Sequence, residues 1–285
     1  MNNQEERNSL STELRKKIYN IVRLMMRTTR NFKIEVFNKE KLEVEGPVIY
    51  SVNHSNCHDV PTISEISDEH FFLLAGVQRL RLVDKIAFFL LGRIYVDRKS
   101  KESKQRSKEQ MIDLVSKGNN LLIFPEGTWN VTPNKLTLPL NWGIIDIAKA
   151  TGATIKPINL EYIKDKCYVN IGDDIIVLPA DTKEDKIEEL KEAMATLKWE
   201  TLEMQGVFSR TSITEKDFEC YSTDRFEEYK NLNVQYEKDI IRKDSVSEEE
   251  VFEHFRYIKL TADNAFLAKS QRSYLEKYGD EIKRR

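Results

Sequence analysis

Two spacings of apolar residues alternate along most of the chain. From residue 32 to about 178, short apolar runs rich in β-branched side chains are separated by longer segments in which apolar residues recur every three or four positions. The first pattern is typical of a buried strand and the second of an amphipathic helix. The expected strands are 48–52, 70–74, 94–96, 121–124 and 154–160, with one or two more between 166 and 178. The expected helices are 61–67, 83–91, 101–116, 142–150 and 183–204.

The alternation of strands and helices indicates the fold class. Strand and helix in turn predict an α/β layer structure, with a mostly parallel central sheet flanked by helices. In open sheets of this kind, ligands bind where strands end and loops begin. We therefore expect the chemistry of this protein in the loops that directly follow its strands.

A helix with one apolar side is predicted ahead of the sheet, at residues 10–30. Its apolar residues at helical spacing are Leu14, Ile18, Ile21 and Met25, with Val22 beside them. The basic residues Lys16, Arg23, Arg27 and Arg30 gather on the opposite side. A basic amphipathic helix is typical of a membrane-surface or partner-docking element, so we expect residues 14–33 to contact a membrane surface. The alternative is that the apolar stripe covers the protein's own core and the arginines face solvent.

Composition changes after the predicted sheet. Beyond about residue 208 the chain has almost no glycine and many Glu, Lys and Tyr residues, which predicts a C-terminal helical extension. The expected division is an N-terminal amphipathic helix at 1–31, a main domain at 32–208 and the extension at 209–285. Residues 210–219 are the expected linker.

Overall composition restricts the class of protein. The chain has 285 residues, of which 40% are hydrophobic, and this is enough to bury a substantial core. Its formal net charge of -2 does not suggest a nucleic-acid partner. Its three cysteines are far apart and none forms a C-x-x-C pair, so neither a disulfide framework nor a zinc ribbon is indicated.

The same features suggest a location. A reducing cytoplasm is the simplest compartment for three scattered cysteines. The polar N-terminus does not resemble a secretory signal. Apolar runs such as 86–92 are far shorter than the roughly 20 residues that a membrane span needs. Together with the basic helix, these features predict a cytoplasmic protein that is peripheral on the inner face of the membrane.

The stretch N-H-S-N-C-H-D, residues 53–59, is the first candidate for chemistry. Within one continuous helix, His54 and Asp59 would point about 140° apart. Pro61 favours a helix that begins near Asp59, which leaves His54 in the loop after the strand 48–52. The carboxylate can then reach back to the imidazole and support it as a general base. The alternative is that Asp59 only caps the helix that follows it.

His54 and His58 are also four residues apart, the spacing of two metal ligands on a helix. Ser55 stands where a catalytic glutamate would be expected in such a motif, and Pro61 argues against a helix through both histidines. A metal-dependent hydrolase that uses His54 and His58 remains the alternative enzyme class. His58 otherwise serves as a capping or packing residue.

Two further loops follow predicted strands. In F-P-E-G-T, residues 124–128, Gly127 permits a turn with positive φ or a close backbone approach to a ligand. In V-D-R-K-S, residues 96–100, Arg98 and Lys99 could clamp a phosphate, although a solvated basic loop has the same composition.

The order of these motifs is more specific than any one of them. N-H-x4-D, G-x-x-x-V-D-R, F-P-E-G-T and the strand 155–158 with its proline resemble the four sequence blocks of the glycerolipid acyltransferase family, over about residues 45–165. That family includes 1-acylglycerol-3-phosphate acyltransferase. The resemblance implies transfer of a fatty acyl group from acyl-CoA or acyl carrier protein to the hydroxyl of a lysophospholipid, with 1-acylglycerol-3-phosphate as the default acceptor and phosphatidic acid as the product.

The resemblance also implies residue roles. His54 would be the general base and Asp59 its orienting partner, with no metal and no cofactor beyond the acyl-donor substrate. The positions matched to acceptor binding are Arg98, Glu126, Gly127 and Thr128. Trp129 stands where the family commonly has Arg or Ser, and Ser55-Asn56 replaces the more usual Gln-Ser. Because of these departures, a different lysophospholipid or a non-lipid hydroxyl remains an alternative acceptor. A module that only binds lipid or a protein partner is the non-enzymatic alternative.

Overall fold

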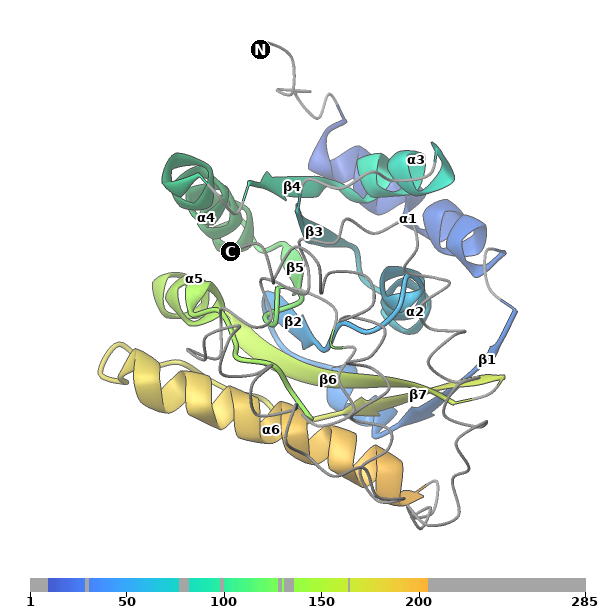
Figure 1. Ribbon diagram of the computed structural model, residues 1–285. Helices are drawn as coiled ribbons and strands as arrows, with labels where there is room; N and C mark the ends of the chain where they lie inside the picture. Colours follow the sequence, from blue (N-terminus) through green and yellow to red (C-terminus); the bar gives the residue numbers. More distant parts are fainter. Residues whose placement is uncertain are drawn as a thin grey trace, which may run out of the picture. The chain divides into compact units, whose positions relative to one another are not determined.

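The computed structural model describes residues 10–28, 31–76, 82–97, 100–127, 130, 136–163 and 165–204, without the side chains of 82–84. The predicted linker and helical extension, 209–285, lie outside the described residues. In the described part of the chain, seven strands form one sheet in the order β1-β7-β6-β2-β5-β3-β4 (Figure 1). They are β1 Lys33–Phe37, β2 Val48–Val52, β3 Phe71–Gly76, β4 Arg93–Val96, β5 Asn120–Ile123, β6 Thr154–Ile163 and β7 Lys166–Ile171.

All strand pairs of this sheet are parallel except the hairpin of β6 and β7. The mostly parallel α/β fold predicted from the sequence is therefore confirmed. Strand β1 was not predicted as a strand, because it lies at the edge of the sheet and its residues are exposed or half-buried. Such a strand lacks the continuous apolar run by which buried parallel strands are recognised.

Helices cover both faces of the sheet (Figure 1). They are α1 Thr12–Arg27, α2 Asp59–Ile66, α3 Leu82–Leu91, α4 Lys101–Ser116, α5 Gly143–Thr151 and α6 Lys183–Met204, with a 3-10 turn, η1, at Lys39–Leu42. Side chains from α1, α2 and α3 form one core cluster with the sheet, and side chains from α4, α5 and α6 form a second. In β2, Val48, Tyr50 and Val52 join the first cluster and Ile49 joins the second. This division follows from the alternation of side chains along a strand.

Helix α1 packs on the protein with a stripe that is shifted from the predicted one but still includes Ile18, Val22 and Met25. Tyr19, Val22 and Met26 are buried against the core, whereas Leu14 and Ile21 are 41% and 68% exposed. The predicted stripe was displaced because the buried side of α1 also includes a charged residue, Arg15, which is 1% exposed. Leu24 is also exposed, at 63%, so α1 presents an apolar strip that the described part of the protein leaves uncovered.

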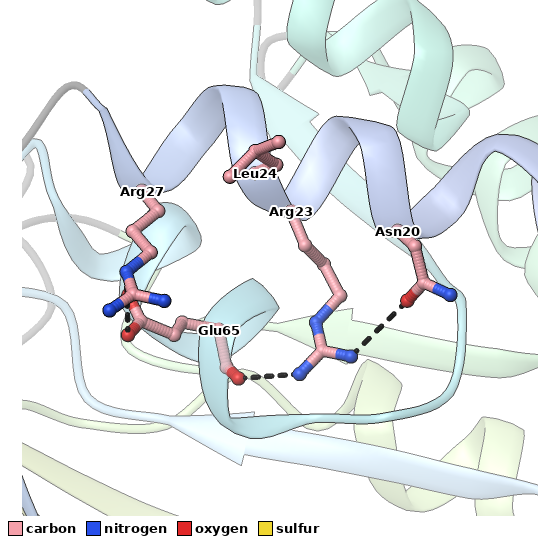
Figure 2. A pocket seen from close by; sticks show the side chains of 5 residues that line it. All are labelled: Asn20, Arg23, Leu24, Arg27 and Glu65. Atoms are coloured by element: carbon pink, nitrogen blue, oxygen red, sulfur yellow. Dashed lines mark hydrogen bonds and ion pairs between the residues drawn. The ribbon is translucent and has the colours of Figure 1, made fainter.

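The predicted basic side of α1 is partly occupied by contacts with α2. Arg23 donates a hydrogen bond to the carbonyl of Glu65 at 2.8 Å and pairs with Asp68 at 3.0 Å. Arg27 lies 3.8 Å from the Glu65 carboxylate. Figure 2 shows both arginines reaching from α1 toward Glu65, where they line a surface pocket together with Asn20 and Leu24. These two arginines therefore hold α1 against α2, and Arg30 lies outside the described residues.

Candidate active site

Asn53 fixes the direction in which the chain leaves β2. Its Nδ2 donates to the carbonyl of Leu160 at 2.9 Å, and its Oδ1 accepts from the Leu160 N–H at 2.7 Å. The side chain thus repeats the pairing of a backbone amide and attaches the end of β2 to β6. His54 follows directly, at the carboxyl edge of the parallel strands, where the sequence placed it.

His54 lies in a loop and Asp59 begins the helix that follows it, as predicted. Helix α2 begins at Asp59, so Pro61 lies in its first turn, where a proline has no helical partner to lose. His54 Nδ1 lies 2.7 Å from Asp59 Oδ2. The same carboxylate oxygen accepts the N–H groups of Ser55 at 2.8 Å and Asn56 at 3.0 Å. Asp59 therefore organises the loop before its helix as well as the imidazole.

Burial gives this pair its chemical character. The Asp59 side chain is fully buried, and the His54 side chain is 15% exposed. With Nδ1–H donated to the carboxylate, the ring's lone pair lies on Nε2. An imidazole in this tautomer can take a proton from a hydroxyl while the carboxylate stabilises the imidazolium that forms.

Apolar and phenolic groups surround the carboxylate. Tyr162 from β6 lies with its hydroxyl 3.3 Å from Thr62 Oγ1. Burial, followed by the negative charge of Asp59, raises the pKa of Tyr162 well above its usual value. The same two causes raise the pKa of the Cys167 thiol. Oδ1 of Asp59 is buried and has no hydrogen-bond partner among the described residues. The charge that steadies His54 therefore lies in a poorly solvated environment.

The F-P-E-G turn after β5 lies beside His54, because β5 and β2 are neighbours in the sheet. The Phe124 ring stacks on the imidazole with centroids 4.0 Å apart and planes inclined by 17°. Gly127 has φ of +67°, and its N–H donates to the carbonyl of Phe124 at 2.9 Å. The predicted left-handed turn at Gly127 is thus present.

Glu126 lies inside the protein rather than in an open site. Its side chain is fully buried, and its two oxygens accept the backbone N–H groups of His54, at 3.1 Å, and Leu138, at 2.7 Å. Its expected role in acceptor binding stays a prediction. The roles expected of Arg98 and Thr128 also stay predictions, since both residues lie outside the described ranges, as does Trp129.

His58 has a packing role in this structure. Its ring meets that of Phe32 edge to face, with centroids 5.3 Å apart. Across the described ranges, no group of three or more His, Cys, Asp or Glu side chains is close enough to hold a metal ion.

Sequence reasoning missed the residues that support the pair from other elements. Asn53 stood within the quoted motif, and its amide next to a strand end was a usable signal. Tyr162 gave none, because it approaches Asp59 and Thr62 only after β6 and α2 pack together.

Comparisons with known proteins relate part of this chain to acyltransferases. Residues 33–161 match the family model described as Acyltransferase. A Chlamydomonas reinhardtii protein named 1-acyl-sn-glycerol-3-phosphate acyltransferase is 25% identical over 130 residues, which cover 45% of this chain and 39% of that protein. A Pseudomonas aeruginosa protein named lyso-ornithine lipid O-acyltransferase is 30% identical over 123 residues, which cover 42% of this chain and 45% of that protein.

A solved structure shares the fold. The crystal structure of the 1-acyl-sn-glycerophosphate (LPA) acyltransferase PlsC from Thermotoga maritima superposes with a TM-score of 0.55 at 18% identity, covering 71% of this chain and 87% of that one. The chain spans less than half the length of the curated relatives it matches. Among the described helices, none is long and apolar enough to cross a bilayer.

Proposed function

Because residues 33–161 match the acyltransferase family model, we propose that this protein transfers a fatty acyl group from an acyl thioester to the free hydroxyl of a lysophospholipid. The donor is acyl-CoA or an acylated acyl carrier protein. 1-Acylglycerol-3-phosphate is the first acceptor to test, and its product is phosphatidic acid. The names of the Chlamydomonas and Thermotoga proteins support this acceptor, and that of the Pseudomonas protein supports testing lyso-ornithine lipid beside it.

The contact between His54 Nδ1 and Asp59 Oδ2 carries the proposal. Nε2 of His54 takes the proton of the acceptor hydroxyl as the oxygen attacks the thioester carbonyl. The tetrahedral intermediate then collapses to the new ester, the carbon–sulfur bond breaks, and the imidazolium returns the proton to the leaving thiolate. The acceptor oxygen itself is the nucleophile, so the reaction needs no acyl-enzyme.

Replacement of the base tests this mechanism. We expect His54→Ala to lower kcat by about 100-fold or more, in the range of general-base contributions, while the circular dichroism spectrum is unchanged. His58→Ala is the matched control, because that histidine lies in the same loop and packs its ring on Phe32. Turnover retained by a folded His54→Ala protein would rule out the mechanism.

Mass spectrometry of the products identifies the acceptor. The purified protein is offered mixed acyl-CoA donors, or acyl carrier protein in a separate arm, with a panel that contains 1-acylglycerol-3-phosphate, lyso-ornithine lipid and other lysophospholipids. Phosphatidic acid as the main product supports the primary assignment. A different acylated product keeps the reaction and replaces the acceptor.

We further propose that α1 brings the site to the membrane. The exposed side chains of Leu14, Ile21 and Leu24 form an apolar strip on this helix, as expected for a helix that lies in the interface of a bilayer. Since Arg23 and Arg27 already contact α2, insertion of the apolar strip should contribute more than attraction to anionic lipid. Such a helix at the cytoplasmic face would let a lysolipid reach His54 from the bilayer.

Vesicle sedimentation separates the two contributions. We expect Ile21→Glu with Leu24→Glu to abolish binding to both neutral and anionic vesicles. Lys16→Gln with Lys17→Gln is the charge control, and it should weaken binding to anionic vesicles only slightly. Unchanged sedimentation of the Ile21 and Leu24 variant would show that α1 does not contact the membrane.

A further inference from the structure

The carboxylate of Glu126 joins two segments that are distant in sequence. Oε2 accepts the N–H of His54 at 3.1 Å, and Oε1 accepts the N–H of Leu138 at 2.7 Å. Glu126 is fully buried, and Leu138 is 1% exposed. The carboxylate therefore links the loop that carries His54 to the segment that carries Leu138.

Burial decides what this carboxylate can touch. A side chain with no exposed surface meets a ligand only after groups that cover it move, and the N–H of Leu138 is one group that lies against this carboxylate. Movement at Leu138 would take one N–H donor away from a buried carboxylate, which is unfavourable in a protein interior. Both backbone N–H groups donate to a carboxylate, and hydrogen bonds of this charge-assisted kind are about twice as strong as neutral ones.

Phe124 and Asn130, on either side of Glu126 in the sequence, also contact His54. Its N–H is bound by Glu126, and its carbonyl accepts the N–H of Asn130 at 2.6 Å. Its ring lies against that of Phe124. Glu126 and Asn130 thus hold the backbone of His54 on both sides, and Phe124 lies across one face of its imidazole.

We infer that Glu126 is a positioning residue that fixes the backbone of His54, and that it does not bind the acyl acceptor. The inference rests on the proposed function for its catalytic consequence only. With Glu126 in place, the imidazole is aimed at Asp59 on one side and at the substrate on the other. Since a misplacement of about 1 Å can cost on the order of 100-fold in rate, the loss of this hold should appear in kcat.

Steady-state kinetics give the first test. Glu126→Gln keeps the size of the side chain. Its amide NH2 group cannot accept a hydrogen bond, so it faces either the N–H of His54 or that of Leu138 without bonding it. We expect kcat to fall about 10-fold to 100-fold while the KM for the acceptor stays within about 2-fold of the wild-type value. Glu126→Asp keeps the charge and shortens the reach, so it should lose kcat in the same way. Glu35→Gln, at an exposed carboxylate of β1, is the matched control and should be unchanged.

A titration without substrate gives a second readout. The imidazole signals of isotope-labelled protein are followed against pH, and the signal of His54 is assigned by its loss in His54→Ala. We expect the midpoint of the His54 titration to shift in Glu126→Gln and to stay in place in Glu35→Gln. Because no acyl transfer is needed, this readout remains decisive if the proposed reaction proves wrong.

The wild-type protein supplies a measurement that does not depend on variants folding. If Glu126 is a positioning residue, the amide of Leu138 keeps its protection against hydrogen exchange when the acceptor saturates the protein. Loss of that protection on saturation would overturn the inference. It would also be overturned if Glu126→Gln raised the acceptor KM about tenfold with kcat and the His54 titration unchanged.

Discussion

Arg15 on α1 donates a hydrogen bond from Nη1 to the backbone carbonyl of Leu90, 2.8 Å away at the end of α3. The same nitrogen also donates to the carbonyl of Phe89. The last carbonyls of a helix have no partner within the helix, and a positive charge is favourable at that end. A buried arginine thus fastens α1 to the remainder of the domain.

Arg15→Met should therefore be strongly destabilising. It keeps the aliphatic length of the side chain but leaves two partly buried carbonyls without their charged donor, and we expect a loss of about 2–4 kcal/mol. Urea unfolding measures the change. Lys16→Met, on the exposed side of the same helix, should stay within about 0.5 kcal/mol of the wild type. Equal effects of the two substitutions would show that the buried contact contributes little.

Gly92, between α3 and β4, should not tolerate a side chain. Its φ is +89°, and an added Cβ would lie 2.6 Å from two ring carbons of Phe72. Gly92→Ala thus combines backbone strain with a steric clash, and we expect a loss of more than about 2 kcal/mol in thermal or urea unfolding. Gly118→Ala isolates the strain, because Gly118 has φ of +76° and nothing within 4 Å of an added Cβ. It should cost only about 1 kcal/mol.

His70 should make the fold sensitive to acid. Burial lowers the pKa of His70 from 6.5 to about 4, and its Nε2 donates to the carbonyl of Leu91 at 2.8 Å. Between these two pH values the unfolded chain binds a proton that the folded chain does not. The free energy of unfolding therefore falls as pH decreases from 6.5 to 4, by about 3 kcal/mol from this group.

Urea unfolding at a series of pH values tests the contribution of His70. In His70→Gln, the free energy of unfolding should fall by about 3 kcal/mol less between pH 6.5 and 4 than it does in the wild type. The variant starts from a lower free energy of unfolding at pH 7. The same slope in His70→Gln as in the wild type would contradict the prediction.

Cysteine labelling should report the burial around Asp59. The Cys57 side chain is exposed in the loop that carries His54, whereas Cys167 is buried, and burial raises the pKa of its thiol. Since the thiolate is the reactive form, iodoacetamide at pH 8 should modify Cys57 in the native protein and reach Cys167 only after unfolding. Peptide mass spectrometry distinguishes the two sites, and native modification of Cys167 at the rate of Cys57 would contradict the structure.

The order of the elements and the contact between His54 and Asp59 were accessible from the sequence because both depend on local signals. Buried strands such as β2 and β5 read as apolar runs, and Pro61 set the start of α2 close enough to show how Asp59 reaches His54. The orientation of α1 was not accessible, since a buried Arg15 looks like a surface residue in any hydrophobic pattern.

The setting of Glu126 was hidden for a different reason. Its partners are 72 residues earlier, at His54, and 12 residues later, at Leu138, and no local spacing relates them. Asn53 illustrates the same limit, because its two bonds with Leu160 join residues that are 107 positions apart. Contacts of this kind exist only once β2, β5 and β6 lie side by side.

The uncovered strip on α1 has a practical consequence for work with the purified protein. In lipid-free buffer, Leu14, Ile21 and Leu24 face water, and two copies of the chain can hide them by meeting strip to strip. Concentrated samples should then scatter more light than a monomer does. A mild detergent at its micellar concentration should return them to single particles.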